Sequence, residues 1–214
     1  HSQDATKINS LSSIPIDISN ETLYYDSSKP ENKINTINNN YNWNTVSILD
    51  LNNSRSNVLV SQWKIMPANL DNKIFNNCPI ENNDVIYFYK EFDNQNDLIL
   101  SVINDNNKYH IGVIKVLKNE HTFSSISTIR NKIYKNFRIE NLTNFSRNIL
   151  VSNDNNVNNK YFKLQLLTNN VRDNNTNHYL GYQYLQHNQS SIVKIYNIND
   201  IPNENNIKIN FKKY

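Results

Sequence analysis

Apolar and polar residues alternate with a period of two over most of the chain from Tyr41 onward, the spacing of a half-buried β-strand. The runs are short, and β-branched and aromatic residues dominate them. The strongest cover residues 45–51, 57–65, 84–92, 97–103, 108–117, 133–142, 148–152, 161–167, 191–198 and 206–212. Weaker runs at 73–76 and 179–185 bring the number of predicted strands to about twelve.

The segments between these runs consist of residues that favour turns, such as DNQN, NDNN, RDNNTN and NDIPNENN. The chain holds 46 Asn and only 2 Gly, so Asn is expected to occupy many of the turn positions that Gly usually takes. The alternative is that an AT-rich genome favours Asn, Ile, Lys and Tyr codons. In either case the Asn content does not indicate an aggregating segment.

No window sustains an amphipathic helix of three turns. The best candidate is 124–135, where Ile126, Ile129, Arg130 and Ile133 have helical spacing, and the sequence leaves helix and strand open there. Many short strands joined by polar turns predict an all-β protein, folded as an antiparallel barrel or a sandwich. Residues 1–40 lack periodicity and are predicted to form a poorly ordered arm, although Ile14-Pro15-Ile16 could dock as an extended strand. Residues 41–214 are predicted to form a single domain.

Charge and composition exclude several classes of function. The net charge is +3 and the longest basic cluster is Lys212-Lys213, so no nucleic-acid-binding stripe is predicted. No apolar run approaches the 18 residues of a membrane-spanning helix. The single cysteine, Cys78, cannot form an internal disulfide, and the few glycines exclude a phosphate-binding loop.

The residues give no catalytic or metal-binding constellation. His1, His110, His121, His178 and His187 lack the spacing of a metal site, and we expect no cofactor. His110 is predicted to lie on the face of its strand opposite Ile111 and Val113. Asp84, Glu91, Asp93 and Asp97 flank one hairpin and are assigned to turns and strand edges. A non-catalytic protein is therefore favoured, without excluding an enzyme.

The segment Gln62-Trp63-Lys64-Ile65-Met66-Pro67 resembles the closing strand of a repeat in ricin-type β-trefoil lectins. Phe137-Arg138-Ile139 and Phe162-Lys163-Leu164 share its aromatic–basic–aliphatic pattern. The resemblance implies a β-trefoil whose repeats are anchored in the core by Trp63, Phe137 and Phe162. A plain reading of Trp63, as a side chain that fills the core of any β protein, stays open beside it.

Within that family, the segment 63–78 is similar to the binding subunits of cytolethal distending toxin. This similarity implies a secreted, non-catalytic subunit that binds a cell-surface glycan or lipid, or a partner protein subunit. The start of the chain at His1-Ser2-Gln3 is consistent with removal of a signal peptide or with a cloned domain. The alternative is a β-sandwich surface adhesin or assembly subunit, with the arm as a donor strand.

Tyrosines are the predicted ligand-binding residues, because each offers a flat apolar ring with a hydroxyl group at its tip. Tyr179, Tyr182 and Tyr184 surround Gly181 in a segment rich in Asn and Gln, whose amides can bind hydroxyl groups. Tyr87 and Tyr89 form a second, weaker candidate on one face of their strand, with Phe88 on the other. The competing interpretation of residues 177–189 is an ordinary half-buried hairpin.

Overall fold

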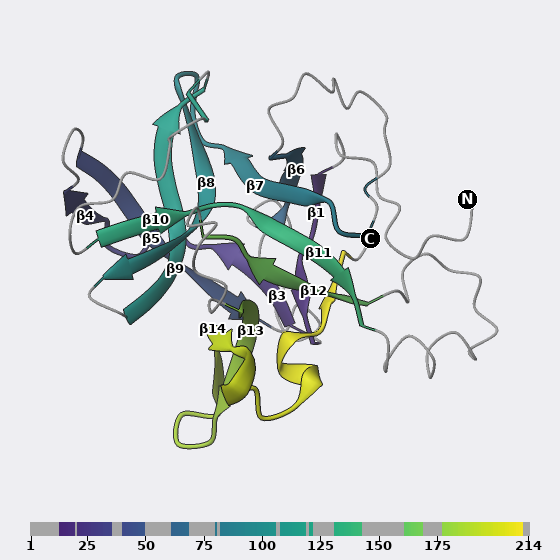
Figure 1. Ribbon diagram of the computed structural model, residues 1–214. Coiled ribbons are helices and arrows are strands. Elements are labelled where there is room, and N and C mark those ends of the chain that lie inside the picture. Colours follow the sequence, from purple (N-terminus) through teal and green to yellow (C-terminus); the bar gives the residue numbers. More distant parts are fainter. Residues whose placement is uncertain are drawn as a thin grey trace.

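The computed structural model describes residues 13–19, 21–35, 40–49, 61–68, 80, 82–105, 108–118, 120–121, 131–142, 161–168 and 177–211. These residues form an all-β structure, in which the helices are two short 3-10 turns, η4 (Ile198–Asp200) and η5 (Glu204–Ile207). The strands (Figure 1) are β1 (Ser13–Ile14), β2 (Asp17–Ile18), β3 (Glu21–Tyr25), β4 (Asn32–Asn35), β5 (Asn40–Leu49), β6 (Trp63–Pro67), β7 (Val85–Glu91), β8 (Asn96–Asp105), β9 (Lys108–Leu117), β10 (Asn131–Tyr134), β11 (Phe137–Asn141), β12 (Phe162–Leu166), β13 (His178–Leu185), β14 (Ser190–Asn197) and β15 (Ile209–Asn210).

The strands join in one antiparallel sheet that closes on itself. Neighbouring strands follow the order β7-β11-β12-β15-β2-β3-β5-β9-β8, and the pairing of β8 with β7 completes a barrel of nine strands. The alternative of a β-sandwich is therefore wrong, because a sandwich requires two separate sheets that face each other. Closure also satisfies strand edges that would otherwise offer unpaired backbone groups.

Six pairings of two alternating kinds follow one another along the path β1-β6-β7-β11-β12-β15-β2, and each kind occurs three times. The first kind joins β1 to β6, β7 to β11, and β12 to β15. The second joins β6 to β7, β11 to β12, and β15 to β2. Three further strand pairs lie outside this path: β3 with β5 and β8 with β9, which complete the nine-strand ring, and β13 with β14, which projects from β12. In Figure 1 the β13–β14 hairpin lies at the bottom of the view, away from β4 at the left.

The main core collects the alternate side chains that point into the barrel. In β12 the pattern of burial is strictly alternating, with Phe162, Leu164 and Leu166 inside. Trp63 and Phe137 are also fully buried, and neighbouring rings pack at centroid distances of 4.5–6.0 Å. Packing of these large side chains accounts for the placement of rare aromatic residues in the predicted strands.

A second cluster, here called the outer core, lies on the opposite face of β7, β8 and β9. Its buried members are Ile34, Tyr87, Ile99, Ile103, Ile114, Val116 and Ile133. Because β8 is buried on both faces, its sequence is a nearly continuous apolar run instead of an alternating one. The strand β10 pairs with β8 and covers this cluster through Ile133.

Residues 13–35 correct the prediction of a poorly ordered arm. They form β1 to β4, and Ile14, Ile16, Ile18 and Leu23 are buried in the main core. Their period-two spacing was overlooked because only three isoleucines carry it through a polar segment. The docking of Ile14-Pro15-Ile16 as extended chain is confirmed by its pairing with β6 and burial. Residues 1–12, 20 and 36–39 lie outside the described residues.

The helical alternative for residues 124–135 is wrong in the part that the structure describes, since Asn131–Tyr134 is β10. Pairing with β8 overrides the helical spacing, because Ile133 is buried opposite Ile103. The weaker run at 179–185 is confirmed as β13. The predicted runs at 73–76 and 148–152, and Cys78, lie outside the described residues.

Asparagine does serve in the turns, mainly through its side chain. Asn197 and Asn203 cap the two 3-10 turns by accepting the backbone N–H two residues on, at 3.0 and 2.9 Å. Among the described residues the backbone has a positive φ at Ser19, Asn83 and Gln189, and at neither glycine. Gly112 and Gly181 are needed for space, because a Cβ on either would lie 2.4 Å from a backbone carbonyl oxygen.

Candidate functional site

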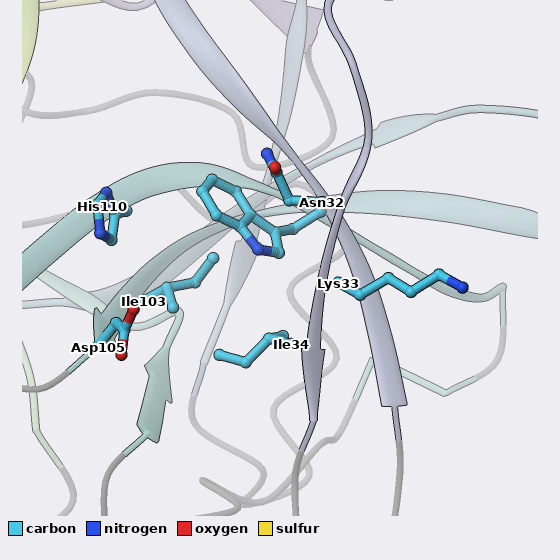
Figure 2. A pocket seen from close by; sticks show the side chains of 7 residues that line it. Asn32, Lys33, Ile34, Ile103, Asp105 and His110 are labelled. Atoms are coloured by element: carbon cyan, nitrogen blue, oxygen red, sulfur yellow. The ribbon is translucent and has the colours of Figure 1, made fainter.

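A pocket of about 340 Å³ lies on the outer face of the barrel where β4, β5, β8 and β9 meet. Its volume falls in the range of sites for small ligands. Figure 2 shows two walls, with His110, Ile103 and Asp105 on one side and Asn32, Lys33 and Ile34 on the other. The lining residues are Asn32, Lys33, Ile34, Trp43, Ile103, Asp105 and His110.

Strand register brings these residues together. β5 pairs with β4 on one side, placing Asn32 opposite Trp43, and with β9 on the other, placing Trp43 opposite Ile114. β8 then places Ile103 opposite His110. Two pairs of consecutive strands, β4–β5 and β8–β9, are far apart in the sequence and together form one concave surface.

Trp43 supplies the aromatic part of the pocket. Its ring is partly buried against the outer core and lies 5.8 Å from the His110 ring, with an angle of 38° between the two planes. Gly112 makes room for it, because a Cβ there would lie 2.8 Å from the indole. An indole with one face supported by the sheet presents a flat apolar surface to a bound molecule.

The polar lining consists of an amide, an imidazole and a carboxylate. Asn32, His110 and Asp105 are all exposed, and they offer donors and acceptors around the indole. In Figure 2 the Lys33 side chain points away from the opposite wall, so its ammonium group is not directed at Asp105 or His110. Ile34 and Ile103 belong to the outer core, which gives the pocket a rigid apolar floor. The arrangement can hold a small polyhydroxylated ring by apolar contact and hydrogen bonds.

The structure does not bring the three tyrosines of residues 177–189 onto one surface. Tyr179 faces the opposite side of β13 from Tyr182 and Tyr184, as their spacing along a strand requires. Tyr179 is 4% exposed, and its burial, together with Glu140, raises the pKa of its hydroxyl group. Tyr182 packs on the main core, and only Tyr184 is largely exposed, at 52%.

Tyr87 and Tyr89 do lie on one face, with Phe88 buried in the main core on the other. Their ring centroids are 6.4 Å apart, and the ring of His121 contacts both, at 5.8 and 4.8 Å. Tyr87 is only 7% exposed, and burial, followed by the nearby Tyr89 and Asp97, raises its pKa to about 12. Tyr87 is therefore part of the interior and is not presented to a ligand.

A hydrogen-bonded chain, here called the His121 clip, connects these residues to β8 and β10. The His121 Nε2 atom is 2.7 Å from an Asp97 carboxylate oxygen, and Nδ1 is 3.0 Å from the Tyr87 hydroxyl oxygen. Because a carboxylate only accepts, His121 donates to Asp97 from Nε2, and its Nδ1 atom forms the second hydrogen bond with the Tyr87 hydroxyl group. Lys135 donates to the His121 backbone oxygen at 2.8 Å and lies 4.0 Å from the centre of the Tyr87 ring. Burial lowers the Lys135 pKa to about 8.

The carboxylates predicted at turns divide into two groups. Asp93 accepts from the backbone N–H groups of Gln95 and Asn96 in the turn between β7 and β8, and Glu91 pairs with Lys64 at 3.0 Å on the surface. Hydrogen bonds in the turn lower the Asp93 pKa. Asp97 departs from the prediction, because it is 4% exposed and bound to His121.

The three predicted core anchors are all buried, but they do not occupy equivalent strands. Trp63 and Phe137 begin β6 and β11, which are counterparts in the pairing described above. Phe162 begins β12, which pairs with β11 and corresponds to β7. The aromatic–basic–aliphatic pattern alone cannot separate these two positions, because each strand needs a large inward side chain.

Sequence reasoning missed Trp43 and the pocket around it. Trp43 stands between two asparagines in NYNWNT, outside any continuous apolar run, which is a signal for an aromatic residue that does not belong to the main core. His110 was correctly placed opposite Ile111 and Val113, which are buried while His110 is exposed. The meeting of these residues depends on long-range pairing, which no local pattern reveals.

No family model matches the chain, and no curated protein is similar enough to count as a relative. None of the described residues forms a helix long and apolar enough to cross a membrane. The described part of the chain also holds no group of three or more His, Cys, Asp and Glu placed to bind a metal ion. The functional argument therefore depends on the pocket itself.

Proposed function

We propose that this protein is a secreted, non-catalytic, lectin-like binding protein that holds a sugar residue of a cell-surface glycan in the Trp43 pocket. One observation carries the proposal: an indole surface, an amide, an imidazole and a carboxylate line one pocket of about 340 Å³. Sugar rings have apolar C–H faces and a rim of hydroxyl groups. Aromatic rings suit the first, and groups that both donate and accept hydrogen bonds suit the second.

The burial of the His121 clip supports the non-catalytic assignment. His121 is hydrogen-bonded to both Tyr87 and Asp97, and these two residues are each less than 10% exposed. A substrate could not reach the hydroxyl group without opening the outer core. The polar groups of the pocket, in contrast, are exposed and suited to binding.

A β-trefoil is the architecture that we propose for the barrel. The threefold alternation of strand pairings from β1 to β2, and the occurrence of one further strand pair (β3–β5, β8–β9 and β13–β14) in each third of the chain, support it. The aromatic residues Trp63, Phe137 and Phe211 support it too, since they are each 74 positions apart and all buried. In this assignment Phe211, and not Phe162, anchors the third repeat. It agrees with the resemblance of the Trp63 segment to ricin-type lectins and to toxin binding subunits.

The function is tested by screening a glycan array with labelled wild-type protein and with two variants. Trp43→Ala removes the indole and should abolish or strongly weaken binding, since loss of a central aromatic anchor costs about 2 kcal/mol or more of affinity. Tyr184→Ala is the matched control, because it removes an exposed aromatic residue from another hairpin.

Binding by the wild type and the Tyr184 variant, with loss in the Trp43 variant, supports the proposal. If the folded wild type binds no glycan, the lectin assignment fails. A pull-down from culture supernatant then tests the other predicted ligand, a partner protein subunit. If Tyr184→Ala is the variant that loses binding, the site belongs to β13 and not to the pocket.

A further inference from the structure

We propose that His121 is a positioning residue for the Trp43 pocket: its clip holds β10 against β8 and thereby fixes the pocket wall formed by Ile103 and Asp105. The purpose of this device rests on the proposed function. Whether the clip fixes the position of β10 and of the pocket wall can be tested on the protein without a ligand.

The four residues of the clip come from four segments of the chain. His121 follows β9, Tyr87 and Asp97 come from β7 and β8, and Lys135 follows β10. Both ring nitrogens of His121 are used, at 3.0 and 2.7 Å, and its backbone oxygen accepts from Lys135 at 2.8 Å. The clip therefore ties the end of β10 to the β7–β8 pair through a single residue.

Strand β10 is the neighbour of the pocket wall. Ile133 pairs with Ile103, and Asn131 pairs with Asp105, so both wall residues of β8 lie in register with β10. Ile133 precedes Lys135 by two positions and is 2% exposed in the outer core. A displacement of the end of β10 would therefore reach Ile103 directly.

The outer core gives this coupling a continuous physical path. Tyr87 of the clip belongs to it, and so do Ile34 and Ile103 of the pocket, while Trp43 packs against it. Close-packed interiors transmit a displacement because they contain little free volume. Loss of the clip should therefore loosen the floor of the pocket, although His121 itself is not a lining residue.

The environment of His121 makes it hard to replace. The Tyr87 and Tyr89 rings contact it from β7, and Asp97 faces it from β8. One Asp97 oxygen already lacks a hydrogen-bond partner, so removal of the imidazole would take away the hydrogen bond of the other oxygen as well. A buried polar group without a partner destabilises its surroundings.

The experiment is nuclear magnetic resonance of the ligand-free protein. The chain has two tryptophans, so two indole N–H signals are expected, and Trp43→Phe assigns them. In His121→Ala the Trp43 signal should shift or broaden, the Trp63 signal should stay in place, and the β10 amides should exchange about tenfold faster with solvent. His121→Gln, whose amide can still donate to Asp97, should restore much of the wild-type spectrum. A role in stability alone would not predict this restoration together with a change confined to Trp43.

Two further variants keep the test decisive. Glu91→Gln breaks the exposed ion pair with Lys64 on the same face and should leave both signals unchanged. Tyr87→Phe removes only one hydroxyl group, and it should shift the Trp43 signal in the same direction as His121→Ala even if the latter does not fold. If Tyr87→Phe and every folded His121 variant leave the Trp43 signal and β10 exchange unaltered, the positioning role is refuted while glycan binding stands. A blank glycan array would refute the function and leave the clip intact.

Discussion

The two tryptophans show how differently one residue type is used in this molecule. Trp63 lies in an apolar strand, is fully buried, and donates its indole N–H to the Leu23 backbone oxygen at 3.2 Å. Trp43 lies between two asparagines, is only partly buried, and faces a pocket. In this chain, the polarity of the flanking residues, rather than the rarity of tryptophan, separates a core residue from a candidate binding residue.

The surroundings of the two glycines differ in the same way, one glycine lying beside buried residues and the other beside the pocket. Gly112 lies in the β8–β9 hairpin and Gly181 in the β13–β14 hairpin. Gly112 lies against the Trp43 ring and the Asn44 backbone oxygen. Gly181 lies in the same way against the Tyr196 ring and the Asn206 backbone oxygen. Tyr196 is 2% exposed and its hydroxyl group donates to the Tyr182 oxygen at 2.9 Å. The packing of Ile207 and Ile201 completes that cluster. The aromatic ring beside the glycine is therefore buried in the β13–β14 hairpin, whereas the ring beside Gly112 lines the pocket.

The largest effect is expected from Trp63→Ala, which should lower the free energy of unfolding by about 3–5 kcal/mol, because it removes a fully buried side chain from the main core. Trp43→Ala should cost only about 1 kcal/mol, because much less of its surface is buried. Urea unfolding followed by circular dichroism measures both. An equal decrease in the free energy of unfolding of the two variants would show that Trp43 is as much a core residue as Trp63.

Gly181→Ala and Gly112→Ala should each destabilise the protein by about 1–3 kcal/mol, because the added Cβ meets a backbone oxygen that cannot move freely. Neither glycine has a positive φ, so the cost is one of space and not of backbone conformation. Only Gly112→Ala should alter the Trp43 indole signal and the proposed glycan binding. A perturbed Trp43 signal in Gly181→Ala would show that the hairpins are not independent.

A smaller effect concerns Lys90, whose ammonium group lies 4.7 Å from the centre of the Trp63 ring and donates to the Gln62 backbone oxygen. Burial lowers its pKa from 10.5 to about 8. Between these two values the unfolded chain binds more protons than the folded protein, so this group makes stability rise with pH. The free energy of unfolding should therefore increase more between pH 8 and 10 in the wild type than in Lys90→Met. Urea titrations at pH 7.5, 8.5 and 9.5 measure it, and parallel pH profiles would contradict the prediction.

The all-β class and most strand positions could be predicted because alternation is local and each strand carries its own signal. The buried strands at 13–18 were missed because three isoleucines in a polar segment are too few to outweigh its composition. Phe211 lies within the predicted run at 206–212, but its burial in the main core was not singled out because it stands beside Lys212-Lys213. Closure of the barrel depends on pairing between distant strands, which periodicity does not encode.

The candidate site was harder to predict than the fold, because its residues meet only through pairing between distant strands. The opposite orientation of Tyr179 relative to Tyr182 and Tyr184 follows from strand parity and was available in the sequence. The Trp43 pocket was not, because its lining comes from four strands whose register is set by pairing. Only the polar setting of Trp43 and the outward position of His110 pointed to it.

The most direct test of glycan binding in the Trp43 pocket is a titration of the wild-type protein with a glycan that it binds on the array, in which the two indole signals are followed. If glycan occupies the Trp43 pocket, the Trp43 signal should move progressively with glycan concentration and the Trp63 signal should stay still. That binding site is ruled out by the opposite pattern: saturating glycan leaves the Trp43 signal unchanged while the signals of Tyr184 and its neighbours in β13 move.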